Sequence, residues 1–401
     1  MTSQHKQRIA FVINSLGPGG AERVLEQVMR MAPSSAWDCH LILLDAEKEW
    51  RTPPDFVTIH RLDSRRSLRA GIGLLKSALA AIAPQLVVSF LVRANVASVI
   101  ACRLLGIPCI ISERSQLSTH LENEHSGLRL RAAKLAPRLT YPRATHVISV
   151  SDGVRTDLIR KFGVRPGRVA TIYNPYDLSR IRQAAVQAPE YPLPERFLVS
   201  AGRLVKRKGF DDLLMAYAQA RSDLPLCILG DGEERQALTH RAAAMGLADR
   251  VHFLGYALNP FAIVARAEMF VSPSHCEGFP NALAEAMALG IPVVSTDCPS
   301  GPAELLDGVE TVGINGVHNG KYGLLTPVSR PDLLAKAIDM MNGQATRQHY
   351  AAAARARMQD FTIEAISDQY WTLFGKTVTP RINSDGEKSR RPPHAAVALP
   401  E

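Results

Sequence analysis

The segment Ser272–Gly290 reads S-P-S-H-C-E-G-F-P-N-A-L-A-E-A-M-A-L-G and contains two glutamates, Glu277 and Glu285. Three apolar residues in it recur at the spacing of one helix face: Leu283, Ala286 and Met287. A helix can begin near Pro280, because proline is tolerated in a first helical turn. Glu277 is therefore predicted to lie in a loop, and Glu285 on the helix that follows. Helix N-termini suit anionic or hydroxyl-rich ligands, but a solvated, charged helix start explains the same spacing equally well.

This segment belongs to the second of two long alternations of strand and helix. In the second half, strands are predicted at 197–201, 226–229, 251–254, 269–272 and 292–296, and the last helices at 330–342, 347–358 and 362–374. In the first half, strands are predicted at 8–14, 38–44, 57–61, 86–90, 107–112, 146–150 and 168–172, and helices at 66–83, 94–105, 126–140 and 151–162. Such alternation implies an α/β fold with parallel sheets covered on both faces. The Ala-, Pro- and Glu-rich stretch 183–194 is predicted to link two domains, as 401 residues require.

The positive charge of the chain lies in its first half. Residues 1–190 contain 26 Lys and Arg against 15 Asp and Glu, whereas residues 191–401 contain 21 against 23. Two predicted helices, 67–83 and 126–141, combine leucines with arginines and lysines. A solvated basic face is one explanation, and contact with an anionic membrane surface is the other. Nucleic acid is not favoured as a partner, because no aromatic residues interleave with the basic ones.

Composition also predicts a reducing compartment and no bound metal. The six cysteines are scattered without C-x-x-C spacing and several fall in apolar runs, which is typical of small buried residues. The histidines show no metal-ligand spacing. The first apolar run is too short for a signal peptide, and no run reaches the length of a transmembrane helix. We therefore expect a cytoplasmic protein, bound peripherally to the cytoplasmic face of the inner membrane.

Several loops at predicted strand ends carry polar or glycine residues. The first strand leads into Gly19-Gly20, which is either a plain tight turn or a close backbone approach to a phosphate or acceptor group. The loop is not G-x-G-x-x-G, so a nicotinamide enzyme is disfavoured. The loop Ser112–Ser115 is expected to face the ligand crevice or to hold an exposed ion pair between its Glu and Arg.

Two cations follow the strand at 197–201. Arg203 and Lys208 lie in a glycine-flanked loop that opens a helix, where an arginine fork and a lysine point charge suit a diphosphate. A solvated basic turn is the alternative. The turn Gly230-Asp231-Gly232 and the Glu277–Glu285 segment also follow strands of this half. Polar loops that converge on one edge of a sheet predict a nucleotide site.

Four motifs together resemble retaining glycosyltransferases of family 4. They are G-G-A-E at 19–22, S-A-G-R-L-x-x-x-K-G-F at 200–210, G-D-G at 230–232 and E-G-F-P-N-x-x-x-E at 277–285. The resemblance covers about residues 8–375 and implies a GT-B architecture, in which two Rossmann-like domains face each other across a cleft. It implies an acceptor-binding domain at 1–190, a nucleotide-sugar domain at 191–360 and a helix at 361–375 that crosses back to the first domain. We expect a disordered tail at 376–401.

The resemblance also implies roles for individual residues. Arg203 and Lys208 would bind the donor diphosphate, Glu285 would accept hydrogen bonds from the ribose hydroxyls, and Glu277 would contact the donor sugar. Gly19 and Gly20 would line the acceptor side near the leaving phosphate, and the strand end at 253–256, which includes Gly255, would read the base. The backbone of Phe279, Pro280 and Asn281 would face the hydroxyls or phosphate of the donor, and Gly202 and Gly230 would also lie at the donor site. No metal or other cofactor is implied.

One departure concerns the first domain, where many relatives have a sugar-contacting histidine in the loop after the fifth strand. This chain has Ser112–Ser115 there, and His120 is the nearest histidine. The loop, together with Ser300–Glu304, resembles bacterial members that extend lipid-linked oligosaccharides with UDP-sugars. The predicted function is transfer from a UDP-hexose or UDP-N-acetylhexosamine to a lipid-linked or polysaccharide acceptor. The alternatives are a lipopolysaccharide-core or glycolipid transferase, or a sugar-nucleotide-binding protein without turnover.

Overall fold

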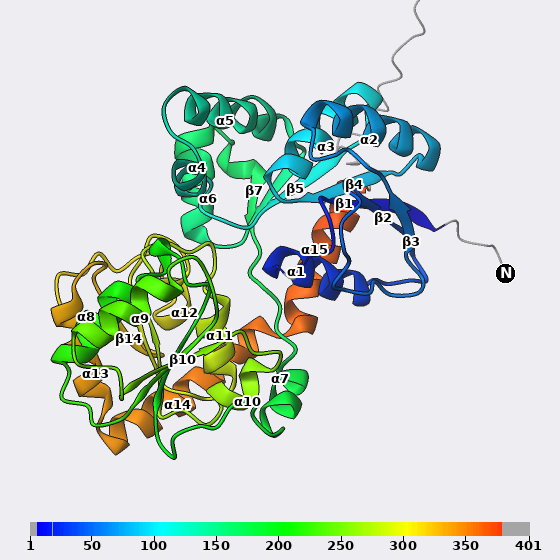
Figure 1. Cartoon of the computed structure of the whole chain (residues 1–401). Helices are drawn as coiled ribbons and strands as arrows, with labels where there is room; N and C mark the ends of the chain where they lie inside the picture. Colours follow the sequence, from blue (N-terminus) through cyan, green and yellow to red (C-terminus); the bar gives the residue numbers. More distant parts are fainter. Residues whose placement is uncertain (1–5, 18, 379–401) are drawn as a thin grey trace, which may run out of the picture.

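The computed structural model describes residues 6–17 and 19–378, which form two α/β domains, one above the other in Figure 1. Each domain is built on a seven-stranded sheet, with strand orders β3-β2-β1-β4-β5-β6-β7 and β10-β9-β8-β11-β12-β14-β13. The first sheet comprises β1 (Gln7–Ile13), β2 (Trp37–Leu43), β3 (Thr58–Arg61), β4 (Leu86–Phe90), β5 (Cys109–Glu113), β6 (His146–Ser149) and β7 (Val169–Thr171). The second comprises β8 (Leu198–Ala201), β9 (Leu226–Leu229), β10 (Val251–Gly255), β11 (Met269–Ser272), β12 (Val293–Thr296), β13 (His318–Asn319) and β14 (Leu324–Thr326).

Parallel pairing runs through both sheets except at one edge, where β13 pairs antiparallel with β14. The predicted α/β class with two parallel sheets is therefore confirmed, but the edge hairpin was missed. Its strands are too short to show a sequence pattern of their own.

Helices cover both sheets. Those of the first domain are α1 (Gly20–Arg30), α2 (Leu68–Ile82), α3 (Val92–Leu105), α4 (Leu117–Glu124), α5 (Gly127–Thr140) and α6 (Asp152–Phe162). Helix α7 (Leu178–Ala185) begins before the predicted linker and runs three residues into it. The second domain contains α8 (Phe210–Gln219), α9 (Arg235–Ala244), α10 (Pro260–Val264), α11 (Asn281–Ala288), α12 (Pro302–Leu306), α13 (Pro331–Met341) and α14 (Gln344–Arg357). No helix in the described part of the chain is both long and apolar enough to cross a bilayer.

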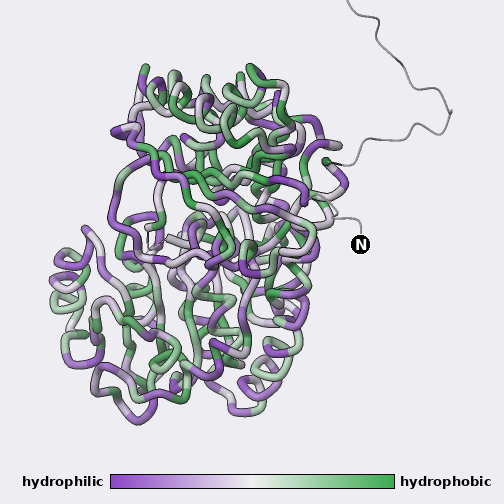
Figure 2. Tube along the Cα trace, turned by 90° about the vertical axis from the view of Figure 1, so that its right-hand side faces the viewer, coloured by the Kyte–Doolittle hydropathy of each residue, from purple (hydrophilic) through white to green (hydrophobic). Residues whose placement is uncertain are grey.

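Burial explains why the apolar runs form strands. The central strand β4 is buried at every position, and hydrophobic segments gather inside the domains in Figure 2. Such strands, covered on both faces, are typical of parallel sheets. All six cysteines are buried and unpaired.

The last described helix, α15 (Ile363–Val378), lies beside the sheet of the first domain (Figure 1). It extends three residues beyond the predicted end, and the rest of the predicted tail, 379–401, lies outside the described residues. Its apolar stripe packs against α1 and the first sheet: the Trp371 ring is 6.0 Å from that of Phe11, and its Nε1 donates to the Val28 carbonyl at 3.0 Å. The C-terminus of the chain therefore completes the core of the first domain.

Two further contacts join the domains. Gly278 lies so close to the first domain that a Cβ there would be 2.2 Å from the Arg114 carbonyl oxygen. On α12, Glu304 is buried and its carboxylate accepts from the backbone N–H groups of Asp152 and Gly153, at 2.7 and 3.1 Å. A carboxylate of one domain thus binds the N-terminus of a helix of the other, where the helix dipole favours negative charge.

Trp371→Ala should destabilise the first domain, because it removes a buried indole that closes the core. We expect a loss of about 3–5 kcal/mol in the free energy of unfolding, measured with urea. The exposed Leu104→Ala on α3 is the control and should change it by less than about 0.5 kcal/mol. Equal effects of the two substitutions would contradict this role of α15.

Glu304 should make stability pH-dependent. Burial raises its pKa from 4.5 to about 7, although the N–H groups of Asp152 and Gly153 act in the opposite direction. A carboxyl group whose pKa is higher in the folded state than in the unfolded state makes its full contribution to stability at pH values below the unfolded-state pKa. This contribution is lost as the pH rises through the folded-state pKa. Between pH 5 and 7.5 the free energy of unfolding of the wild type should therefore fall by on the order of 2 kcal/mol more than that of Glu304→Gln. If the urea midpoints of the wild type and of Glu304→Gln change by the same amount across this pH range, Glu304 is not the source of the pH dependence.

Candidate active site

The predicted site residues lie where the second sheet changes direction. Strands β8 and β11 are neighbours, and from them the chain builds outward to β10 on one side and β12 on the other. At such a switch point the loops after the two strands diverge and leave a crevice at the carboxyl edge. The loop after β8 carries Arg203 and Lys208, and the loop after β11 carries Glu277 and leads into α11.

Lys208 and Glu277 are in direct contact. Lys208 Nζ lies 2.6 Å from Glu277 Oε1, which also accepts from Ser274 Oγ at 2.7 Å. They line a pocket of about 20 Å³ between the two loops. The carboxylate is largely buried, so the lysine both neutralises it and holds it in one orientation.

Arg203 is exposed at the start of the same loop. Within the described residues, its side chain makes no hydrogen bond or ion pair. It is therefore an exposed positive charge that a ligand can bind without breaking an internal contact.

The three predicted glycines at strand ends lie against one another. Gly202, Gly230 and Gly255 follow or end β8, β9 and β10. A Cβ on Gly230 would be 1.9 Å from the Gly202 carbonyl oxygen, and the Gly230 N–H donates to the Gly255 carbonyl at 2.7 Å. Close packing of adjacent loops therefore accounts for Gly230, and Gly255 has a φ of +80° that favours glycine, whereas a Cβ on Gly202 would meet no atom closer than 3.8 Å.

Glu285 faces the first domain. Its Oε1 lies 2.6 Å from Nη1 of Arg23, on α1, and this carboxylate raises the pKa of the arginine. Both residues line a second pocket of about 360 Å³, together with the exposed Tyr256 at the end of β10. Arg23 was not predicted as a site residue, because nothing in the spacing of the sequence shows that residues 23 and 285 meet.

Two helix N-termini converge beside these residues. Helix α1 begins at Gly20, where a Cβ would be 3.1 Å from Asn281 Nδ2, and Asn281 is the first residue of α11. Asn281 Oδ1 also accepts from Asn174 Nδ2 and from Tyr176 OH, each at 2.7 Å. The partial positive charges of the two helices thus meet between the domains.

The intervening residues of the α11 loop are packed rather than exposed. The Phe279 ring is buried against Tyr173 and Phe361, with centroids 5.4 and 5.9 Å away. Pro280 lies against Gly301, where a Cβ would be 2.4 Å from its Cδ. These side chains fix the path of the backbone at the start of α11.

The loop Ser112–Ser115 contains no exposed ion pair, so that interpretation was wrong. Glu113 is buried and accepts from Tyr141 OH at 2.8 Å, and burial raises its pKa. Arg114 turns to α15, where its Nη1 donates to Tyr370 OH at 3.0 Å. Both charged side chains support the loop, and its backbone is the part that meets Gly278.

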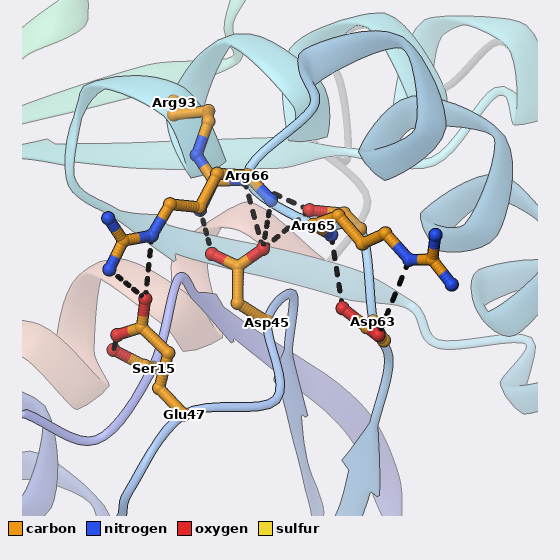
Figure 3. A network of polar contacts seen from close by, with 8 residues as sticks. Ser15, Asp45, Glu47, Asp63, Arg65, Arg66 and Arg93 are labelled. Atoms are coloured by element: carbon orange, nitrogen blue, oxygen red, sulfur yellow. Dashed lines mark hydrogen bonds and ion pairs between the residues drawn. The ribbon is translucent and has the colours of Figure 1, made fainter.

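A polar network fixes other loops at the carboxyl edge of the first sheet (Figure 3). Asp45, after β2, accepts from Ser64 Oγ at 2.6 Å and pairs with Arg93 on α3. Burial alone would raise the pKa of Asp45, but these hydrogen bonds lower it. Asp45 also accepts from the backbone N–H of Arg66, a residue held at φ +59°. The network stabilises a left-handed backbone conformation that residues other than glycine rarely adopt.

No metal site accompanies these groups. Across residues 6–17 and 19–378, no set of three or more His, Cys, Asp and Glu is arranged to hold an ion.

Family models match almost the whole chain. The model described as Glycosyltransferase Family 4 matches residues 18–180, and that of Glycosyl transferases group 1 matches residues 182–357. The chain is 30% identical over 369 residues to the N-acetylgalactosamine-N,N'-diacetylbacillosaminyl-diphospho-undecaprenol 4-alpha-N-acetylgalactosaminyltransferase of Campylobacter jejuni, covering 88% of this chain and 96% of that protein.

Solved structures share the fold. Anabaena HepE in complex with UDP has a TM-score of 0.71 at 22% identity, covering 92% of this chain and 100% of that one. The apo form of the lipopolysaccharide outer core galactosyltransferase WaaB has a TM-score of 0.71 at 20% identity, with the same coverage. The predicted family and two-domain architecture are confirmed: the chain is a glycosyltransferase with the GT-B fold and belongs to glycosyltransferase family 4.

Proposed function

We propose that this enzyme transfers a hexose or N-acetylhexosamine from a UDP-sugar to a lipid-linked or polysaccharide acceptor, with retention of configuration. The observation that supports it most is that Lys208 and the N-terminus of α11 line one crevice, with the N-terminus of α1 against α11 and Arg203 in the same loop as Lys208. This arrangement suits a diphosphate, whose negative charge grows as its bond to the sugar breaks. Fixed positive groups stabilise that charge most in the transition state.

The residues around the crevice divide between the parts of the donor. Arg203 and Lys208 bind the diphosphate, and the backbone of Gly19, Gly20 and Phe279–Asn281 lies near it. Glu277, held by Lys208, contacts the sugar. Glu285 accepts from the ribose hydroxyls, and the base lies in the 360 Å³ pocket near Tyr256. Gly202, Gly230 and Gly255 shape the floor below the nucleotide.

Retention follows from attack on the face that the leaving group vacates. The bond between the anomeric carbon and the diphosphate oxygen breaks, and its electron pair goes to the diphosphate. The acceptor hydroxyl oxygen forms the new bond, and its proton goes to a donor phosphate oxygen. The products are the glycosylated acceptor and UDP. Because side chains and helix N-termini supply the positive charge, we propose that no metal takes part.

The acceptor assignment is supported by relatives and by the surface. The Campylobacter relative is named for a diphospho-undecaprenol acceptor, and the Salmonella typhimurium lipopolysaccharide 1,6-galactosyltransferase is 29% identical over 222 residues. We favour the lipid-linked acceptor over the lipopolysaccharide core because the longer match is to the former. The ion-paired Lys208 and Glu277 in the crevice disfavour a binding protein without turnover.

Helix α5 is the proposed membrane contact, on the cytoplasmic face of the inner membrane. Its Leu128, Leu135 and Leu139 are exposed by 80%, 54% and 51%, an unusual position for three leucines on one helix. Arg129, Arg131 and Arg138 on the same helix are also exposed. An exposed helix with apolar and basic residues is typical of interfacial binding to anionic lipid.

Lys208→Ala and Arg203→Ala should each lower the turnover number for UDP-sugar hydrolysis or transfer by about 100- to 1,000-fold, since each removes a group that stabilises the leaving diphosphate. The substrate panel should contain UDP-glucose, UDP-galactose and their N-acetylhexosamine counterparts. Lys336→Ala, an exposed lysine on α13, is the matched control and should leave turnover unchanged. Near-normal turnover in either crevice variant would overturn the diphosphate assignment.

The wild type should float with vesicles that contain anionic lipid, and binding should weaken as salt is raised. The double variant L128D/L139D should lose this binding, because it places charge on the apolar face of α5. Leu104→Asp changes a similarly exposed leucine on α3 and serves as the control. If the L128D/L139D variant and the Leu104→Asp control float with the vesicles to the same extent, α5 is not the membrane contact.

A further inference from the structure

A cavity of about 490 Å³ lies directly beside the donor crevice. Lys206 and Arg207, which directly precede Lys208, line this cavity, and so do His275 and Cys276, which directly precede Glu277. Lys208 and Glu277 themselves line the crevice. Phe210 lines both spaces. The two short loop segments therefore form a shared wall, with the donor groups on one side and a separate set of side chains on the other.

Both domains contribute to the cavity. Thr119 and Asn123 come from α4 of the first domain, and the other lining residues come from the second. At this boundary Cys276 Sγ lies 3.5 Å from Gln116 Oε1. A molecule in the cavity would touch both domains and lie next to the sugar end of the donor, which is the position that the second substrate of a transferase must occupy.

The cavity contains two cationic side chains that have no partner among its other residues. Arg241 pairs with Asp211 at 3.3 Å, and His275 Nε2 is hydrogen-bonded to Asp212 Oδ2 at 2.8 Å. Among the described residues, the side chains of Lys206, Arg207 and Glu234 make no hydrogen bond or ion pair. Lys206 and Arg207 are adjacent in the chain, so their two unpaired charges together favour a ligand that carries negative charge.

The remaining lining groups suit a sugar. Phe210, Met215 and Leu238 form an apolar surface of the kind that the C–H face of a sugar ring covers. Asn123, Asp212 and Glu234 offer oxygen atoms that accept hydrogen bonds from hydroxyl groups. The chemistry of the cavity is therefore that of a hydroxyl-rich ring with an anionic substituent.

We propose that this cavity is an acceptor subsite, and that it binds a sugar carrying a phosphate or carboxylate group through Lys206 and Arg207. This inference rests on the proposed function, because it assigns the second substrate of that reaction. It gives the nucleotide-sugar domain a part in acceptor recognition. It also makes acceptor binding favour the approach of the two domains, since the ligand joins α4 to the loop before α8.

Ligand-observed NMR on the full-length protein tests the proposal. UDP is first added to saturation, so that sugar phosphates cannot occupy the donor crevice. Glucose 1-phosphate, glucuronate and glucose are then titrated as probes of the phosphate, the carboxylate and the neutral ring. We expect at least one anionic probe to bind at least tenfold more tightly than glucose, and the K206A/R207A variant to weaken it at least tenfold. The control R221A/K336A removes one exposed arginine and one exposed lysine elsewhere on the same domain. It should leave the affinities for the anionic probe and for glucose unchanged.

Three outcomes overturn the inference. They are no binding of either anionic probe while UDP is bound, equal binding of glucose and the anionic probes, and equal loss in the two double variants. UDP binding measured in the same samples separates the two proposals. If UDP fails to bind the wild type, the proposed function fails and the acceptor subsite with it. If UDP binds but the anionic probes do not, only the acceptor subsite is wrong.

Discussion

The site depends on how closely two backbones approach each other across the boundary between the domains. At Gly278 there is no room for a side chain, because the Arg114 carbonyl lies where a Cβ would be. Arg114 is in turn held by Tyr370 on α15, the helix that starts in the second domain and ends on the first. The contact between the loop after β11 and the first domain is therefore anchored by the C-terminal helix α15.

Glu304 contributes a second constraint of a different kind. Its carboxylate satisfies two of the free N–H groups at the start of α6, so separation of the domains would expose both the helix end and the carboxylate to water. Gly153 lies against the Pro299 carbonyl, where a Cβ would approach to 2.3 Å. Steric fit and a hydrogen-bonded charge thus act at separate points along one boundary. Together they restrict the relative position of two domains that each have their own sheet.

The sequence could predict the sheets and the loops but not the contacts between domains. Buried apolar runs such as β4 and β11 are recognisable because parallel strands are covered on both faces. The loops after β8 and β11 could be placed in one crevice from their order and from the family motifs. Short elements, such as α7 and the β13–β14 hairpin, were missed or misplaced because they are too short to show a period.

Contacts between residues far apart in the chain could not be predicted from the sequence, for a physical reason. Arg23 meets Glu285, and Glu304 meets Asp152, only because two separately folded domains come together. Local periodicity carries no information about such pairs. The same limit explains the error at Ser112–Ser115: adjacent opposite charges suggest a surface ion pair, whereas Glu113 is bound by Tyr141 and Arg114 by the C-terminal helix.

The ion pairs of the two glutamates support their proposed role as contacts to the donor. Glu277 already faces Lys208, and Glu285 faces Arg23, so each carboxylate is paired with a cation and oriented to accept hydrogen bonds. In the proposed complex, Lys208 shares its charge between Glu277 and the donor diphosphate. Arg203, unpaired within the described residues, and the N-termini of α1 and α11 then supply the positive charge that no carboxylate has already neutralised. We therefore propose that the glutamates hold the donor, whereas Arg203, Lys208 and the backbone stabilise the leaving group.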